Sequence, residues 1–178
     1  IKLLAKLRNR KDDTIMLAIV EELAKDGLEV VDQTLYLKPL MPACGVLSHR
    51  KPTASEEDDI RFGFVTAKAM GGMDIGQTVV VKHKAVMAVE AIEGTDACIR
   101  RGGALGREKS VVVKVAKPNQ DPRFDVPAVG KQTILSMIES KCNVLAMEAG
   151  RTLFVEQEEV LDLANRHDIC ICAVDKNF

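Results

Sequence analysis

Aromatic residues are scarce in this chain, because its 178 residues include no Trp, one Tyr and five Phe. So few rings argue against a surface on which nucleic-acid bases or sugars stack. A basic excess is lacking as well, since 25 Lys and Arg residues face 26 Asp and Glu residues. Proteins that hold nucleic acid by its phosphates need such an excess, so we expect no nucleic-acid partner.

Long apolar runs are also missing. No stretch approaches the roughly 20 apolar residues that a membrane-spanning helix needs, and no signal peptide is visible. The five cysteines are odd in number and irregularly spaced, which argues against a disulfide framework and favours a reducing cytoplasm. Cys170 and Cys172 form a C-x-C pair in an apolar run, a pattern more typical of a buried strand than of a zinc site.

What the chain does contain is typical of a globular protein with a core, with 47% hydrophobic and 29% charged residues. The pattern of the first part of the sequence, up to Gly27, predicts helices. Residues 2–10 have a helical pattern, and an amphipathic helix follows from Asp12 until Asp26–Gly27 ends it. A short strand is predicted over Leu28–Val31, and Ser48–Ser55 is interpreted as a linker because turn-forming residues gather there.

The region after the linker predicts a mixed α/β domain. Ser55 and Asp58 form a capping pattern for a helix that ends at Gly71–Gly72, and His83–Lys84 joins two apolar runs as a hairpin. Strands are predicted over 78–82, 85–90, 110–115, 144–147, 152–155 and 169–174, and helices over 133–140 and 156–167. This alternation predicts an α/β fold with a mixed β-sheet and flanking helices, preceded by a partial helical segment.

A first polar stretch, Glu90–Asp96, follows one of the predicted strands. Gly94 permits a tight turn or the close approach of a ligand. Thr95 or Asp96 can begin a short helix that ends near Gly102–Gly103, and a helix N-terminus attracts phosphate. The alternative is a plain capped turn, with the arginines that follow it on a solvated face.

A second polar stretch, Lys114–Pro127, mixes cations with carboxylates. Pro122 and Pro127 constrain its backbone, so that Asp121 and Asp125 are expected on a rigid loop. Cations that hold phosphate oxygens, beside carboxylates that hold Mg²⁺, are what a phosphate-plus-metal site requires. The alternative is a rigid loop held by a structural Arg–Asp pair.

Several blocks of sequence together carry a family resemblance. They are DIGQTVVV (74–81), VEAIEGTD (89–96), KVAKPNQDPRFDVPAVG (114–130), Thr133–Ile134 and Glu148–Gly150. In this order they resemble the LpxI-type UDP-2,3-diacylglucosamine pyrophosphatases of lipid A biosynthesis. The resemblance covers about the last hundred residues closely and the preceding helices loosely.

The resemblance implies an enzyme that hydrolyses the pyrophosphate bond of UDP-2,3-diacylglucosamine, with release of UMP and 2,3-diacylglucosamine 1-phosphate. It implies metal-assisted attack of water, with Mg²⁺ or another divalent cation as the cofactor. It also implies a nucleotide-sugar lipid as the substrate, held between two domains. The expected location is the cytoplasm of a Gram-negative bacterium, in peripheral contact with the inner membrane, and a homo-oligomer is left open.

The resemblance further implies roles for individual residues. Asp125 and Asp121 are the expected catalytic carboxylates, and Asp125, Asp96 and Glu93 are the expected metal ligands. The residues expected to contact the phosphates or the sugar are Gln77, Thr95, Arg100, Lys114, Lys117, Gln120 and Arg123.

Two domains of unequal completeness are expected. Residues 1–47 are expected to be the remnant of a truncated N-terminal domain, and residues 53–178 the C-terminal catalytic α/β domain. Two alternatives to an active enzyme stay open, namely a non-catalytic module that binds nucleotide sugars or phospholipids, and an inactive fragment of the enzyme. Mg²⁺-dependent release of UMP distinguishes these alternatives.

Overall fold

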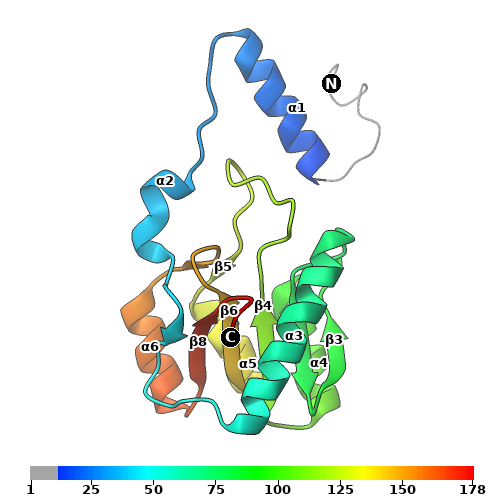
Figure 1. Ribbon diagram of the computed structural model, residues 1–178, viewed down its shortest axis with the longest axis vertical. Helices are drawn as coiled ribbons and strands as arrows, with labels where there is room; N and C mark the ends of the chain where they lie inside the picture. Colours follow the sequence, from blue (N-terminus) through cyan, green and yellow to red (C-terminus); the bar gives the residue numbers. More distant parts are fainter. Residues whose placement is uncertain (1–11) are drawn as a thin grey trace.

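The computed structural model describes residues 12–178. An N-terminal part built from short helices precedes a part built around a β-sheet (Figure 1). The elements are α1 (Asp12–Lys25), α2 (Thr34–Leu37), the 3-10 helix η2 (Lys38–Leu40), β1 (Gly45–Val46), α3 (Ala54–Gly72), β2 (Thr78–Lys82), β3 (Ala85–Val89), α4 (Thr95–Gly106), β4 (Ser110–Lys114), β5 (Ala128–Val129), α5 (Lys131–Ser140), β6 (Cys142–Glu148), β7 (Leu153–Phe154), α6 (Gln157–Arg166) and β8 (Cys170–Val174).

Six strands form one mixed sheet in the order β1-β8-β6-β4-β2-β3, and β5 pairs with β7 in a separate two-stranded sheet. Strands β4, β6 and β8 are parallel, while β2 pairs antiparallel with both β3 and β4. Consequently β3, β4, β6 and β8 all end at the same edge of the sheet, which we call the carboxyl edge. The predicted α/β class with a mixed sheet and flanking helices is confirmed.

The two faces of the sheet are covered by different helices. Helix α3 packs on one face, and α4, α5 and α6 pack on the other. Strand β2 shows how the sequence produces this arrangement, because side chains alternate between the faces of a strand. Val79 and Val81 belong to the cluster with α3, whereas Val80 belongs to the cluster with the other three helices. The continuous apolar run is therefore explained by burial on both faces.

Helix α4 is longer than the sequence predicts. It continues through Gly102–Gly103 to Gly106. A Cβ atom at Gly102 would collide with Val80 of β2, and one at Gly103 would collide with Ser140 of α5. The glycines therefore serve close packing inside the helix rather than its termination.

The start of α3 is also shifted from its predicted position. Thr53 is the N-cap, because its hydroxyl accepts a hydrogen bond from the Glu56 amide at 3.3 Å. Glu56 in turn accepts one from the Thr53 amide at 2.8 Å, which completes a capping box two residues before the predicted one. The predicted hairpin at His83–Lys84 is confirmed, and both turn amides donate to the carboxylate of Asp59.

The predicted strand over Leu28–Val31 is wrong. This segment is irregular, and its apolar side chains Leu28 and Val31 are 57% and 47% exposed. Within residues 12–178 no strand runs beside it, so its backbone has no ladder to join. The helical pattern over residues 2–10 lies outside the described residues. Within the described part of the chain, no helix is both long and apolar enough to cross a membrane.

Candidate phosphate-binding site at the carboxyl edge

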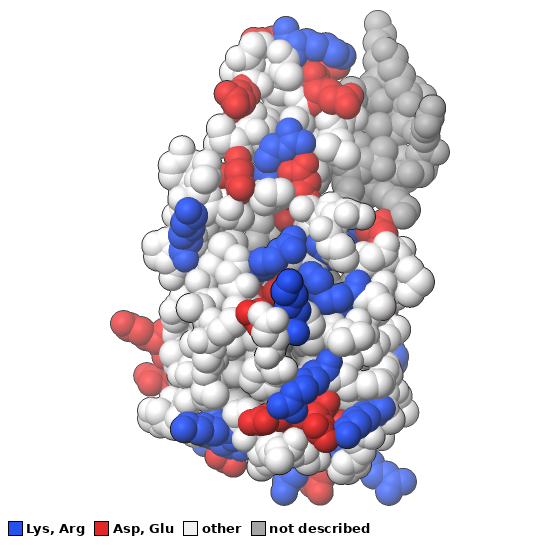
Figure 2. Space-filling model, viewed as in Figure 1, with Lys and Arg blue, Asp and Glu red and all other residues white. Residues whose placement is uncertain are grey.

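The two polar stretches that the sequence singles out meet at the carboxyl edge. One follows β3 and the other follows β4, and the residues that enter β2 lie between them. The Val115 amide donates to the Gln77 carbonyl at 3.0 Å, and the Glu90 amide donates to the Thr78 carbonyl at 2.8 Å. In Figure 2, Lys and Arg side chains gather over this middle part of the molecule.

Lys114 is the last residue of β4 and is only 6% exposed. Its Nζ donates to Thr95 Oγ1 at 3.0 Å and to the Ala128 carbonyl at 2.9 Å. Burial lowers the pKa of this lysine, against the opposing effect of nearby negative charges. The carboxylates that oppose the shift are those of Glu90, Asp96 and Asp125. Lys114 is thus a buried amine whose direct partners are neutral.

Thr95 connects Lys114 to a carboxylate that the sequence prediction missed. The Thr95 hydroxyl donates to Glu90 Oε1 at 2.8 Å, and the Gln77 amide donates to Glu90 Oε2 at 3.3 Å. Gly94, with a φ of 81°, is the N-cap that precedes α4. Thr95 and the helix N-terminus therefore lie beside Lys114. A polar residue directly after an apolar strand was the signal that could have identified Glu90.

We call residues 115–127, between β4 and β5, the site loop. Lys117 forms an ion pair with Asp74, with 2.9 Å between Nζ and Oδ1. Gln120 Oε1 accepts from the Lys117 amide at 2.9 Å, and Gln120 Nε2 donates to Gln77 Oε1 at 3.3 Å. These contacts connect three of the residues expected to bind substrate, namely Gln77, Lys117 and Gln120.

Asp121 and Arg123, also on the site loop, form a forked ion pair with each other. Arg123 Nε donates to Asp121 Oδ1 at 3.0 Å, and Arg123 Nη2 donates to Oδ2 at 2.7 Å. The guanidinium lowers the pKa of the Asp121 carboxyl. This geometry is that of the structural Arg–Asp pair which the sequence left open as an alternative.

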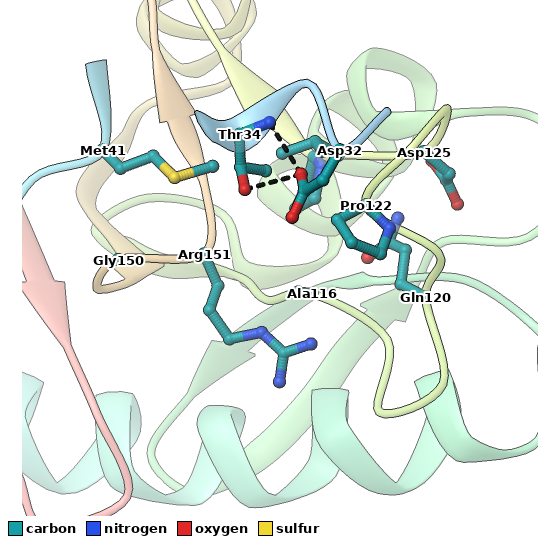
Figure 3. A pocket seen from close by; sticks show the side chains of 11 residues that line it. Asp32, Thr34, Met41, Ala116, Gln120, Pro122, Asp125, Gly150 and Arg151 are labelled. Carbon is teal, nitrogen blue, oxygen red and sulfur yellow. Dashed lines mark hydrogen bonds between the residues drawn. The ribbon is translucent and has the colours of Figure 1, made fainter. Parts of the chain in front are cut away.

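A cavity of about 230 Å³ opens between the site loop and the segment around α2 (Figure 3). Asp125 and Gln120 line it, as the sequence prediction would require of site residues. Arg151, Asp32 and Thr34 also line it and were missed. Arg151 extends from the turn after β6, and among the described residues it has no hydrogen-bond or ion-pair partner for its guanidinium. Its position just after the block Glu148–Gly150 was the only sequence signal.

The N-terminal segment is attached to this cavity through the backbone. The Gly150 amide donates to the Pro42 carbonyl at 2.9 Å, and the Leu47 amide donates to the Ile171 carbonyl at 2.8 Å. Asp32 Oδ1 accepts from the Thr34 amide at 2.8 Å, which fixes the start of α2. The wall opposite the site loop is thus built from residues far away in sequence.

Two of the expected residues are engaged elsewhere. Arg100 pairs with Glu139 of α5, with 2.7 Å between Nε and Oε2, and lines a separate cavity between α4 and α5. Glu93 forms an ion pair with Arg101, which lowers the pKa of the Glu93 carboxyl. The structure therefore does not bring Arg100 and Glu93 together with Lys114.

The donors for a metal ion are fewer than the sequence implied. Among the described residues, no three His, Cys, Asp or Glu side chains are grouped so that they could hold a metal ion, so Glu93, Asp96 and Asp125 do not form one set of ligands. Asp96 and Asp125 have no hydrogen-bond or ion-pair partner for their carboxylates in the described part of the chain. Mg²⁺ is usually bound by one or two carboxylates, with water and substrate phosphates as its other ligands. The charges of Asp96 and Asp125 both act on Lys114, and carboxylates beside a phosphate site are the kind of protein ligand that such an ion uses.

Comparison with known proteins gives concordant matches. Residues 43–172 match the family described as the LpxI C-terminal domain, and residues 1–40 match the LpxI N-terminal domain. The chain is also 32% identical over 172 residues to the UDP-2,3-diacylglucosamine pyrophosphatase LpxI of Caulobacter vibrioides. That alignment covers 92% of this chain and 61% of the relative, so the chain spans about three fifths of the relative's length.

Proposed function

Because the chain belongs to the LpxI family, we propose that the protein hydrolyses the pyrophosphate bond of UDP-2,3-diacylglucosamine in lipid A biosynthesis. The products are UMP and 2,3-diacylglucosamine 1-phosphate. The observation that carries this proposal is Lys114, a buried cation at the carboxyl edge whose hydrogen bonds all go to neutral acceptors. Lys114 thus holds a positive charge beside Thr95, at the start of α4, that an anionic ligand can neutralise.

In this proposal, Lys114 and the groups around it bind the diphosphate. An anion that enters the site gains Coulomb energy from the buried ammonium, more than from an exposed one, because water screens it less. The N-terminus of α4 adds unsatisfied amides and the positive end of the helix dipole. Arg151 adds a cation on the cavity wall, from the turn after β6.

Asp125 is the residue to which we assign the attacking water. It lines the cavity from the site loop and has no competing ion pair among the described residues. A carboxylate in this place orients a water molecule and accepts its proton as the bond to phosphorus forms. A Mg²⁺ ion held by Asp96 and Asp125 would neutralise phosphate charge when bound. Asp121 then has a supporting role, because Arg123 already holds it.

Because the proposed substrate carries acyl chains, we propose that the protein contacts the inner membrane from the cytoplasmic side. Met73, Ile75 and Ile92 are 66%, 47% and 105% exposed, and they lie on the two neighbouring segments before β2 and after β3. Exposed apolar residues at the rim of a site are suited to acyl chains or a bilayer surface. We propose that residues 53–178 form the domain that carries Lys114 and the site loop, and that residues 1–47, which supply the opposite wall of the cavity, belong to another domain.

The test is Mg²⁺-dependent release of UMP by the full-length protein. We expect Asp125→Asn to lower kcat by at least about 100-fold, as loss of a general base does. Asp58→Asn is the matched control, because Asp58 is an exposed carboxylate on α3 that pairs with Lys84 outside the site. Full-length protein that binds the nucleotide sugar without releasing UMP would show a binding module instead, and a normal kcat in Asp125→Asn would remove Asp125 from the mechanism.

A further inference from the structure

The chain leaves the sheet at Ala116, two residues after the end of β4. The amide and the carbonyl of Ala116 are both hydrogen-bonded to side chains rather than to a neighbouring strand. Glu148 Oε2 accepts from the Ala116 amide at 2.8 Å, and Lys68 Nζ donates to the Ala116 carbonyl at 2.8 Å. Ala116 is also the first residue of the site loop that lines the cavity. Lys68 and Glu148 thus fix the point from which the loop departs.

Lys68 and Glu148 also bind each other. Lys68 Nζ lies 3.0 Å from each oxygen of the Glu148 carboxylate, and the two side chains are only 24% and 9% exposed. Lys68 comes from α3, and Glu148 ends β6. The ladder between β4 and β6 stops at the pair Lys114 and Met147, so the Glu148 side chain takes over where backbone pairing ends.

Neither side chain lines the cavity, although Ala116 does. Any influence of Lys68 and Glu148 on a ligand must therefore pass through the loop. We propose that Lys68 and Glu148 are positioning residues, which hold the start of the site loop so that its reactive groups have the geometry for hydrolysis. This inference depends on the proposed function.

The arrangement gives a physical reason for such an effect. Lys117 directly follows Ala116, and Asp125 lies on the same loop. A displacement of about 1 Å in a reacting group can cost on the order of 100-fold in rate, even when the cause is remote. Loss of one partner also leaves a buried amide or charge unsatisfied, so the loop start would shift to recover a partner.

Glu148→Gln in the full-length protein is the test, with Glu56→Gln as the matched control. Glu56 forms a comparably buried ion pair with Arg50, at 2.5 Å and with side chains 13% and 19% exposed. It also accepts a hydrogen bond from Asn143 near the start of β6, at the opposite end of the strand from Glu148. Both variants thus disturb a buried pair, but only one disturbs the site loop.

We expect Glu148→Gln to lower kcat for UMP release by about 10- to 100-fold, with KM changed less than about threefold. Hydrogen exchange at the Ala116 amide should become faster in the same variant. In Glu56→Gln, kcat and Ala116 exchange should stay at their wild-type values even where thermal stability falls. Lys68→Arg, which keeps a donor cation, should retain more activity than Lys68→Met.

Equal kcat values in Glu148→Gln and the wild type would overturn the inference. A loss confined to KM would also overturn it, because that result indicates direct contact of Glu148 with the substrate. A wild-type protein that releases no UMP would instead overturn the proposed function. The wild-type assay therefore tests the proposed function, and the comparison of variants tests the positioning role of Glu148.

Discussion

Two lysines reach the carboxyl edge of the sheet, and their surroundings are opposite. Lys68 lies against the carboxylate of Glu148 and holds the Ala116 backbone. Lys114 is more deeply buried, yet it donates only to a hydroxyl and a carbonyl. Burial alone therefore does not distinguish a structural lysine from one that binds a ligand. The distinguishing property is whether a carboxylate is bound directly to the ammonium, as it is at Lys68 and is not at Lys114.

The two arrangements also differ in what they cost the folded protein. A buried charge is expensive unless it is paired, and the cost of Lys68 is offset by Glu148. At Lys114 burial prevails and lowers the pKa, despite the neighbouring carboxylates. Sites that retain such a cost are typical of functional regions. Four predictions test this contrast.

Lys68→Met should give the largest effect on stability. It leaves the Glu148 carboxylate buried without its cation, and loss of one partner of a buried pair costs about 3 kcal/mol in the free energy of unfolding. Urea denaturation measures this loss. The double variant Lys68→Met with Glu148→Gln should recover part of it, because the unpaired charge is then gone. A loss below about 1 kcal/mol would mean that the pair behaves like an exposed one.

Lys114→Met should have the opposite effect, with a large loss of activity and no loss of stability. We expect kcat/KM for UMP release to fall about 100-fold, as it does when a buried donor to a developing charge is removed. The melting temperature should not fall, because an apolar side chain replaces a buried charge that lacks an ion pair. Thermal denaturation and UMP release on the same preparation provide the two readings. A large loss of stability together with normal activity would reverse the roles assigned to the two lysines.

The pH dependence of activity should follow the titration of Lys114. As pH rises through the lowered pKa of Lys114, the amine loses its proton and with it the charge that attracts phosphate. Activity should therefore decline at alkaline pH. In Lys114→Arg the guanidinium keeps its charge, so the decline should move to higher pH. Superimposable pH profiles of the two proteins would assign the decline to another group.

Arg151→Ala should give the smallest effect of the four. We expect KM to rise about 10-fold with kcat little changed, which is the loss of one charge-assisted hydrogen bond to a phosphate. Arg151 is exposed, so added salt should shrink the difference between variant and wild type. Lys109→Ala is a suitable control, since Lys109 is an exposed cation at the opposite end of β4. Similar KM values in all three proteins would exclude Arg151 from the site.

Much of the fold could be predicted because most strands and helices carry a clear periodicity. The hairpin at His83–Lys84 and the strand over 110–114 come directly from that pattern. The length of α4 could not be predicted in this way. Gly102–Gly103 is a termination signal in isolation, and only the packing against Val80 and Ser140 turns it into the interior of a helix.

The candidate site was predictable where its residues follow a strand end. Thr95 and Lys114 come from the two polar stretches, and the topology brings those stretches to one edge. The pair of Lys68 and Glu148 was not predictable, since 80 residues separate its members and each is an ordinary charged residue in its own element. Arg151 and the residues of the opposite cavity wall were also not predictable, because only the fold brings them to the site loop.

The attachment of the N-terminal segment has a consequence for how the sequence can vary. The bonds from Gly150 to Pro42 and from Leu47 to Ile171 join main-chain atoms only. The Leu47 side chain takes no part in these bonds, so substitutions at this position can accumulate while the cavity wall stays where it is. The exceptions are proline at position 47 and proline at position 150, because each would remove one of the two donated protons.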